Sequence, residues 1–163
     1  MEVKEIMLKT SDNCIVAVDE KILKKSKLLK NLIEEYDNDD EIPLNEVDKN
    51  VLTTIIEYLQ HYNTMEQKKI PTPFPERTDE TFFKGILNDS WTYDYLKKMS
   101  IEEAIILGNA ANYLQIDGLL DILAAFLAHE MSNCDVEVAR KKFGIECDMT
   151  EKEVAEYDKY PLD

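Results

Sequence analysis

The sequence predicts an α/β protein in which a small sheet near the N-terminus is followed by helices. Three observations support this class. Two short β-prone runs stand near the N-terminus, with a turn-forming stretch between them. Apolar residues recur at helical spacing from Lys21 onward and again through the C-terminal half. The length of 163 residues, of which 44% are hydrophobic, suits one compact domain with a helical appendage.

The predicted sheet begins with a β-hairpin. Its strands are residues 6–10 and 14–18, and its turn is residues 11–13, because Asp and Asn tolerate left-handed backbone conformations. Residues 42–44 are expected to form only a short strand at an edge of the sheet. The reason is Pro43, which lacks the amide donor that a central strand needs.

Helices follow the hairpin. A helix or a pair of helices spans about residues 21–36. Asp48 is a candidate N-cap for the next helix. The apolar residues of that helix recur on one face, at Val51, Leu52, Ile55, Ile56 and Leu59.

A proline-rich loop interrupts the helices. Three prolines between residues 71 and 75 make residues 63–77 a semi-rigid connector, which we expect to contribute nothing to the core. We interpret the region near 63–90 as an insertion loop within one fold. After this loop, Trp91, Tyr95 and Leu96 predict a short helix with an aromatic anchor.

Capping signals delimit the C-terminal helices. Ser100 and Glu103 form a capping box, which opens a helix that runs through Tyr113. The residues of this helix that recur on one face are Ala104, Leu107, Ala111 and Leu114. Further helices are predicted at residues 115–131, at 136–143 before Gly144, and from a second capping box, Thr150 with Glu153, to residue 157 or 159.

The predicted helix at 115–131 is apolar nearly all round. Between residues 119 and 128 the only polar side chain is that of Asp121. Such a helix must be covered on both sides. One interpretation is a central helix buried within this chain. We favour the other, in which one face packs internally and the other meets a partner, because the chain offers few other large apolar elements.

The charge balance argues against two classes of partner. Nineteen Lys and Arg face thirty-four Asp and Glu, for a net charge of -15, and such a surface repels phosphate backbones and anionic headgroups. We expect no nucleic-acid and no membrane partner, and no signal peptide or membrane span. The three widely spaced cysteines Cys14, Cys134 and Cys147 fit reduced thiols. These features predict a soluble protein of the cytoplasm and nucleus.

The sequence lacks the motifs of catalytic and metal sites. Its four glycines are scattered, so no glycine-rich phosphate loop exists. His61 and His129 lie far apart and outside ligand spacing, so we expect both at the surface or its boundary. Cys134 and Cys147 alone make a weak case for a metal site. We therefore expect no catalytic residue, no metal, no cofactor and no enzymatic activity.

One segment resembles a known family. Residues 110–121 read AANYLQIDGLLD, which is similar to the signature of the S-phase kinase-associated adaptors. These subunits hold F-box proteins onto a cullin in SCF-type ubiquitin ligases. Further matches follow in the family's order along the whole chain, at residues 8–12, at 42–44 with Val47, at Trp91 with Tyr95 and Leu96, at 142–145 and at 148–151.

The resemblance implies a BTB/POZ fold, a small mixed sheet with surrounding helices, extended by C-terminal F-box-binding helices. Residues 1–131 would form the BTB/POZ domain. Residues 132–163 would be a helical extension that forms the F-box-binding region together with the preceding helices. The implied function is that of a non-catalytic adaptor between F-box substrate receptors and a cullin scaffold.

The resemblance also assigns two sets of contact residues. Those for the F-box are Leu120, Ala124, Leu127, Met131, Ala139, Phe143 and Ile145, and those for the cullin are Asn112 and Tyr113. Each of these residues has an alternative role in internal packing. Phe143 would then pin its helix to the core, and Tyr113 would be an aromatic at a helix end with a hydrated hydroxyl.

The chain departs from the family at its C-terminus. The family usually ends in an Asn-x-Trp segment, whereas residues 157–163 offer only Tyr157 and Tyr160 before Pro161. We expect this tail to contribute less to F-box binding than a Trp would.

Two rival interaction functions stay open at this point, and a third rival, an enzyme, is disfavoured by the missing catalytic motifs. The chain could be a scaffold that binds F-box-like proteins outside a ligase, in a kinetochore or trafficking complex. It could be a BTB homodimer, or an elongin-type adaptor, although the latter type generally lacks the segment after Met131. A homodimer is also expected when no F-box protein covers the apolar face.

Overall fold

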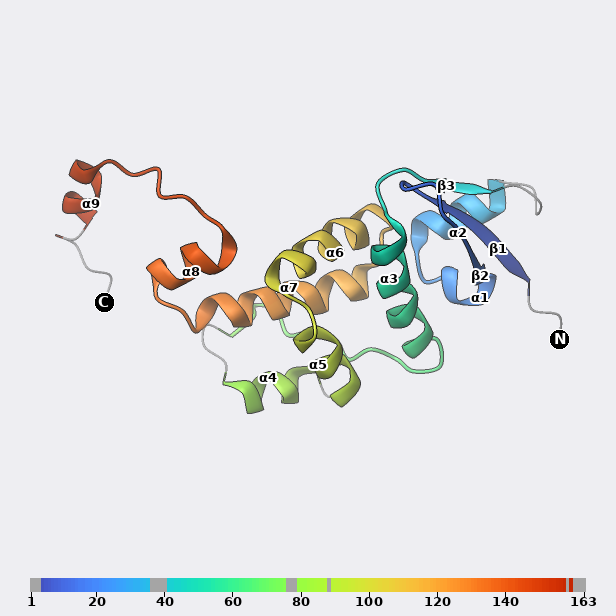
Figure 1. The fold of residues 1–163 in the computed structure, drawn as a ribbon. Coiled ribbons are helices and arrows are strands. Elements are labelled where there is room, and N and C mark those ends of the chain that lie inside the picture. Colours follow the sequence, from blue (N-terminus) through green and yellow to red (C-terminus); the bar gives the residue numbers. More distant parts are fainter. Residues whose placement is uncertain (1–3, 36–40, 76–78, 88, 158, 160–163) are drawn as a thin grey trace. The chain divides into compact units, whose positions relative to one another are not determined.

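A computed structural model describes residues 4–35, 41–75, 79–87, 89–157 and 159. The chain divides into two compact units, Met1–Asn133 and Cys134–Asp163. The elements of the first unit are β1 (Glu5–Thr10), β2 (Ile15–Asp19), α1 (Glu20–Leu23), α2 (Lys27–Glu35), β3 (Ile42–Leu44), α3 (Lys49–His61), α4 (Glu80–Leu87), α5 (Ser90–Lys97), α6 (Ile101–Tyr113) and α7 (Asp117–Ser132) (Figure 1). The second unit holds α8 (Val136–Phe143) and α9 (Glu151–Tyr157).

The described strands form one mixed sheet of order β2-β1-β3. β1 pairs antiparallel with β2 and parallel with β3. The predicted hairpin is confirmed, and its turn contains Asn13 with φ 61, the left-handed conformation that Asn tolerates. β3 lies at an edge, as Pro43 predicts. The α/β class with a small mixed sheet is therefore confirmed.

The core of the first unit lies where the inner face of the sheet meets the helices. Alternate residues of β1, Ile6, Leu8 and Thr10, are buried, and so are the apolar faces that the sequence predicts for α3 and α6 at Leu52, Ile55, Leu59, Ala104, Leu107, Ala111 and Leu114. Asp48 caps α3 by accepting from the Val51 amide at 2.9 Å. Ser100 and Glu103 form the predicted capping box of α6.

The boundary between α6 and α7 differs from the prediction by two residues. The sequence predicts that the second helix begins at residue 115, but α7 begins at Asp117. Gln115 has φ 55 and donates its amide to the Asn112 carbonyl at 3.1 Å, while Ile116 donates to the Ala111 carbonyl at 2.9 Å. These two bonds are those of a Schellman motif, which ends α6 and leaves residues 115 and 116 outside both helices.

The connector at residues 63–77 contributes to the core, contrary to the prediction, and the region near 63–90 is not a loop throughout. It contains α4, whose Phe83, Ile86 and Leu87 are buried. The connector before α4 also reaches the core, because Ile70 is buried and Phe74 packs against the core. Propensity could not locate these contacts, since what holds the segment in place is tertiary packing.

In the second unit, α8 ends at Gly144 with φ 64, and Thr150 with Glu153 caps α9, both as predicted. Most residues of the tail 157–163 lie outside the described part of the chain. The expectation that this tail contributes less to F-box binding than a Trp would therefore stays a prediction. The acidic segment at 36–40 likewise lies outside the described residues.

A hydrogen-bond network around Asp89 joins α3 to α5. The Asp89 carboxylate accepts from the Thr92 hydroxyl at 2.6 Å and the Tyr62 hydroxyl at 3.3 Å, and it lies 2.8 Å from His61 Nε2. It also caps α5 through the Trp91 amide at 3.2 Å. His61 in turn stacks on Trp91, with ring centroids 3.9 Å apart.

Asp89→Ala should lower the free energy of unfolding by about 2 kcal/mol, because it removes both a helix cap and the shared acceptor of the network.

The contribution of Asp89 to stability should depend on pH. Burial opposes ionisation of its carboxyl group, but the hydrogen bonds from Thr92 and His61 outweigh this effect and hold the pKa of Asp89 below its ordinary value. The stabilisation should therefore be complete above the ordinary pKa, about 4, and disappear as the pH falls through the lowered one. Urea unfolding at neutral and acidic pH checks this. Asp94→Ala on the same helix, at an exposed position, is the control and should change little.

Candidate interaction surfaces

Close packing against the loop after α3 fixes the start of α7. A Cβ added at Gly118 would lie 2.6 Å from both Gln67 Oε1 and the Tyr58 hydroxyl oxygen, so a larger residue there would displace these two side chains. Gln67 Nε2 donates to the Gly118 carbonyl at 2.8 Å, and the Tyr58 hydroxyl donates to Gln67. Burial raises the pKa of Tyr58, which keeps this hydroxyl protonated as a donor.

One side of α7 faces the core and the other does not. The buried residues are Leu119, Ile122, Leu123, Ala125, Phe126 and His129. The four predicted F-box residues on this helix, Leu120, Ala124, Leu127 and Met131, recur at intervals of three and four, which places them together on one side. On that side Ala124 is exposed, Met131 is 45% exposed, and the two leucines are half-buried.

The apolar side of α7 is thus only partly covered by the described part of the chain. Leu127 packs against the core, whereas Ala124 and Met131 present their side chains to solvent. The described residues of the first unit therefore do not bury this helix all round. We call the residues Leu120, Ala124, Leu127 and Met131 the α7 face.

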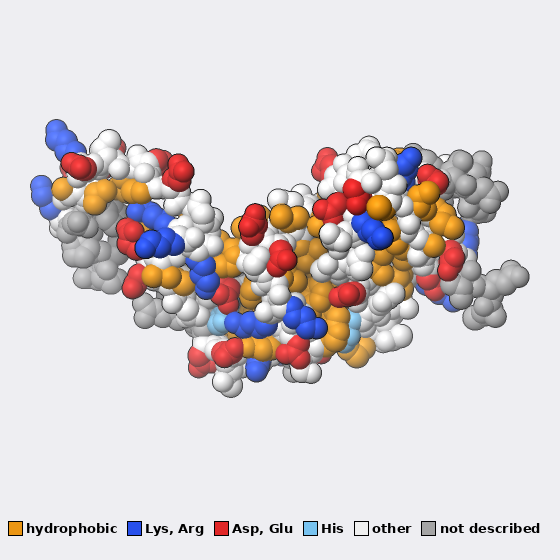
Figure 2. All heavy atoms as spheres, viewed as in Figure 1, with side chains coloured by type: hydrophobic (Ala, Val, Ile, Leu, Met, Phe, Trp, Pro, Cys, Tyr) orange, Lys and Arg blue, Asp and Glu red, His pale blue; other side chains and the backbone are white. Residues whose placement is uncertain are grey.

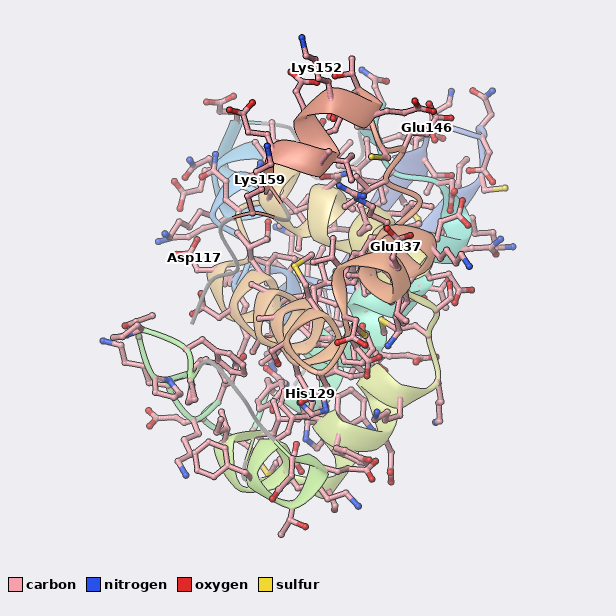
Figure 3. The ribbon with its side chains drawn as sticks, turned by 90° about the vertical axis from the view of Figure 1, so that its left-hand side faces the viewer. Asp117, His129, Glu137, Glu146, Lys152 and Lys159 are labelled. Carbon is pink, nitrogen blue, oxygen red and sulfur yellow. The ribbon has the colours of Figure 1, made fainter. Side chains whose placement is uncertain are left out.

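His129 is buried, which corrects the expectation of a surface or boundary position. Its side chain is 5% exposed and stacks on Phe83 of α4, with ring centroids 4.4 Å apart and planes 2° from parallel. In Figure 3 it lies on the side of α7 that faces α4. The expectation failed because it took residues 63–90 for a loop and so omitted the helix that covers this histidine. His61, in contrast, lies at the boundary, half-buried beside Asp89.

The second unit exposes several apolar side chains among its charged ones. No residue of α8 is buried, and Val136 and Val138 are more than half exposed. The three predicted F-box residues in this unit lie close in sequence: Ala139 and Phe143 are half-buried on α8, and Ile145 is 53% exposed just after it. The Ile145 amide donates to the Arg140 carbonyl at 2.8 Å, which fixes the turn after Gly144.

The predicted cullin residues end α6. Asn112 is exposed, and Tyr113 is half-buried and packs against the core. Tyr113 also lines a pocket of about 250 Å³ together with residues of α3 and α6. A second pocket of about 340 Å³ shares Val51 and Ile106 with the first and extends toward Tyr95 and Met99.

Together these pockets make a groove between α3 and α6 with a mixed lining. Its apolar centre includes Ile106, which is 48% exposed. The charged residues that line it are Asp48, Glu57, Glu103 and Lys98, so acidic side chains outnumber basic ones. Sequence reasoning did not find this groove. A signal existed in Ile105 and Ile106. Four consecutive apolar residues of one helix, 104–107, point in different directions, so they cannot all face the protein core.

Two classes of site find no support in the described residues. They contain no group of three or more His, Cys, Asp or Glu that could hold a metal ion. No helix among them is long and apolar enough to cross a membrane. On the face drawn in Figure 2, hydrophobic side chains lie at the surface among acidic and basic ones.

Comparison with known proteins gives a consistent result. A model described as the Skp1 family, tetramerisation domain, matches residues 4–64, and one described as the Skp1 family, dimerisation domain, matches residues 117–159. An S-phase kinase-associated protein 1 homolog of Tetrahymena thermophila is 32% identical over 152 residues, which cover 93% of this chain and 89% of the relative. Two SKP1-like proteins of Arabidopsis thaliana are also similar. SKP1-like protein 4 is 32% identical, over 94% of this chain and 91% of the relative, and SKP1-like protein 18 is 30% identical, over 98% and 95%.

Proposed function

Because this chain belongs to the Skp1 family, we propose that it is a non-catalytic adaptor that links F-box substrate receptors to a cullin scaffold in an SCF-type ubiquitin ligase. Membership of the family confirms the resemblance carried by residues 110–121 and the BTB/POZ class of the fold. The family consists of non-catalytic adaptors, which supports a role of this class.

The observation that carries the proposal is the α7 face. An apolar helix surface that a chain leaves partly uncovered is typical of a site for another helix, which packs its own apolar residues into the i, i+4, i+7 pattern. Leu120 and Leu127 supply half-buried walls, and Ala124 between them leaves room for a partner's side chain. The helices of an F-box are the partner that the family implies.

The second unit would contribute to the same partner. Ala139, Phe143 and Ile145 supply apolar side chains, and none of the three is fully buried. A short helix with no buried residue gains little stability from its own chain, so a partner that covers it removes apolar area from water. We propose that the extension 132–163, with α7, forms the F-box-binding region.

The cullin would bind at the end of α6. Asn112 offers an exposed amide, and Tyr113 presents an aromatic ring at the end of the groove between α3 and α6. The apolar lining of that groove suits side chains from a helix, and its acidic residues suit a partner that carries Lys or Arg. These residues belong to a different helix from the α7 face, so the two partners need not compete.

The proposed mechanism is recruitment. When F-box protein and cullin bind the same adaptor, the substrate and the ubiquitin-charged enzyme are held in one complex. The effective concentration of the substrate rises although the adaptor makes and breaks no bond. We place this activity in the cytoplasm and nucleus, where thiols such as those of Cys14 and Cys147 remain reduced.

Two variants should separate the partners. Asn112→Ala with Tyr113→Ala should weaken binding of a cullin N-terminal segment about tenfold or more, and leave F-box binding nearly unchanged. Phe143→Ala should do the reverse, with an F-box affinity lower by about 2 kcal/mol, or roughly thirtyfold. Isothermal titration calorimetry with each partner measures both effects.

Tyr113 packs against the core, so a control for stability is needed. Tyr113→Phe keeps the ring and should preserve the melting temperature. Comparing it with the double variant shows how much of any loss of cullin binding comes from the lost packing of the ring. If the double variant melts early and loses both partners equally, Asn112 and Tyr113 are structural and the cullin assignment is wrong.

A further inference from the structure

A short stretch of backbone connects the two proposed docking surfaces. Asn112 and Tyr113 end α6, and Leu120, the first residue of the α7 face, lies in the first turn of α7. We call residues 114–116, which lie between the two helices, the α6–α7 junction. Because the junction sets the direction of α7 relative to α6, its backbone geometry determines how the α7 face is placed relative to the end of α6.

A buried serine from the N-terminal part of the chain holds this junction. Ser26 is 0% exposed and directly precedes α2. Its hydroxyl accepts from the Leu29 amide at 3.1 Å and donates to the carbonyl of Leu114, the residue that caps α6. One hydroxyl therefore satisfies a free amide at the start of α2 and a free carbonyl at the end of α6, 88 residues away in the sequence.

The neighbouring Lys27 adds two weaker contacts. Its amide donates to the Gln115 carbonyl at 3.4 Å, and its ammonium group forms an ion pair with Asp117, the first residue of α7. Both side chains of this ion pair are more than half exposed, so the pair contributes little by itself. In Figure 1 the ends of α6 and α7 that meet at the junction lie on the side of α1 and α2. The buried bond from Ser26 is the main contact.

The junction contains a backbone conformation that is unfavourable for its residue. Gln115 has φ 55, a left-handed conformation that glutamine adopts only rarely. In the right-handed conformation Gln115 would continue α6 past its present end and change the direction of α7. The carbonyls of Leu114 and Gln115 are bonded to Ser26 and Lys27, which opposes this change.

We propose that Ser26 is a positioning residue for both docking surfaces. Because it is fully buried, it touches neither partner, and it acts by holding the α6–α7 junction. The residues at the end of α6 and those of the α7 face then keep the arrangement that binds a cullin and an F-box protein together. This role rests on the proposed function, since it requires that these two surfaces bind those partners.

Ser26→Ala should weaken binding of both the F-box peptide and the cullin N-terminal segment about fivefold, the size expected when a residue acts on a site through packing. Isothermal titration calorimetry on the full chain, at a temperature where the variant is folded, measures both affinities. Thr92→Val is the matched control, because it removes a hydroxyl from another residue that is 0% exposed, on α5. It should lower the melting temperature to a similar extent and leave both affinities within about twofold.

A second substitution separates positioning from a general loss of stability. Gln115→Gly removes the steric cost of the left-handed conformation, because glycine has no Cβ. Added to Ser26→Ala, it should return both affinities to within about twofold of the unaltered chain. Gln115→Ala in the same background keeps a Cβ and should restore neither affinity.

Hydrogen exchange of the free chain gives a readout that needs no partner. Ser26→Ala should accelerate exchange at residues 115–120, whose amides include those of Gln115, Ile116 and Leu120 bonded within the junction and the first turn of α7, and Thr92→Val should not. The inference is overturned by unchanged exchange at these residues, or if Ser26→Ala leaves the affinity for either partner within about twofold. It is also overturned if Gln115→Ala restores binding as well as Gln115→Gly does. If the unaltered chain binds neither partner, the proposed function is wrong, and the exchange data still decide whether Ser26 holds the junction.

Discussion

Replacing Ala124 with Glu should abolish F-box binding, with a loss of at least a hundredfold in affinity, or about 3 kcal/mol. Ala124 is exposed between Leu120 and Leu127 on the α7 face. A carboxylate there would be buried against apolar side chains in the complex without a partner for its charge, which is costly. Calorimetry with an F-box peptide measures the effect.

The control for this prediction is Thr53→Glu, which adds the same charge at an exposed position of α3. It should leave F-box affinity within about twofold, as expected for surface changes away from a contact. If Ala124→Glu binds the F-box peptide as the unaltered chain does, the α7 face is not the binding surface. Cullin binding by the variant should persist, which separates a lost contact from a lost fold.

The second large effect concerns stability. Phe83→Ala should lower the free energy of unfolding by about 3–5 kcal/mol, because Phe83 is fully buried and stacks on His129. The neighbouring Phe82 offers a matched control. It is 51% exposed on the same helix, so Phe82→Ala should cost less than about 1 kcal/mol.

Chemical denaturation of both variants decides the outcome. If Phe83→Ala and Phe82→Ala both lower the free energy of unfolding only slightly, α4 is not part of the cooperatively folded unit. The interpretation of residues 63–90 as a loop would then regain support. A large effect of Phe83→Ala alone would show that this helix holds the C-terminal end of α7 through His129. Binding of the F-box peptide by the folded fraction of Phe83→Ala would then report how far the α7 face depends on that support.

Local signals predicted most of the fold. The capping box of Ser100 and Glu103, the cap at Asp48 and the stop at Gly144 each depend on a few neighbouring residues, so the sequence alone places them. The start of α7 was wrong by two residues because Gln115 adopts a left-handed conformation without being a glycine or asparagine. That choice depends on the packing of Ile116, which no local signal reports.

The candidate surfaces were predictable to different degrees. Helical periodicity puts Leu120, Ala124, Leu127 and Met131 on one side of α7 without any structure, but only the structure shows that this side is partly exposed. The burial of His129 was missed because it depends on α4, a helix in a region where prolines favoured a loop. The groove between α3 and α6 was missed for a different reason: it joins two helices about fifty residues apart in the sequence, and no local signal places them side by side.

The central claim is that one chain holds an F-box protein and a cullin at the same time. Sedimentation velocity of the full chain with an F-box peptide and a cullin N-terminal segment, each labelled with a different fluorophore, tests this most directly. The account predicts a single species that carries both labels in a 1:1:1 ratio, which loses the cullin in Asn112→Ala with Tyr113→Ala and the F-box in Ala124→Glu. Binding of one partner that displaces the other, or binding of neither, would contradict it.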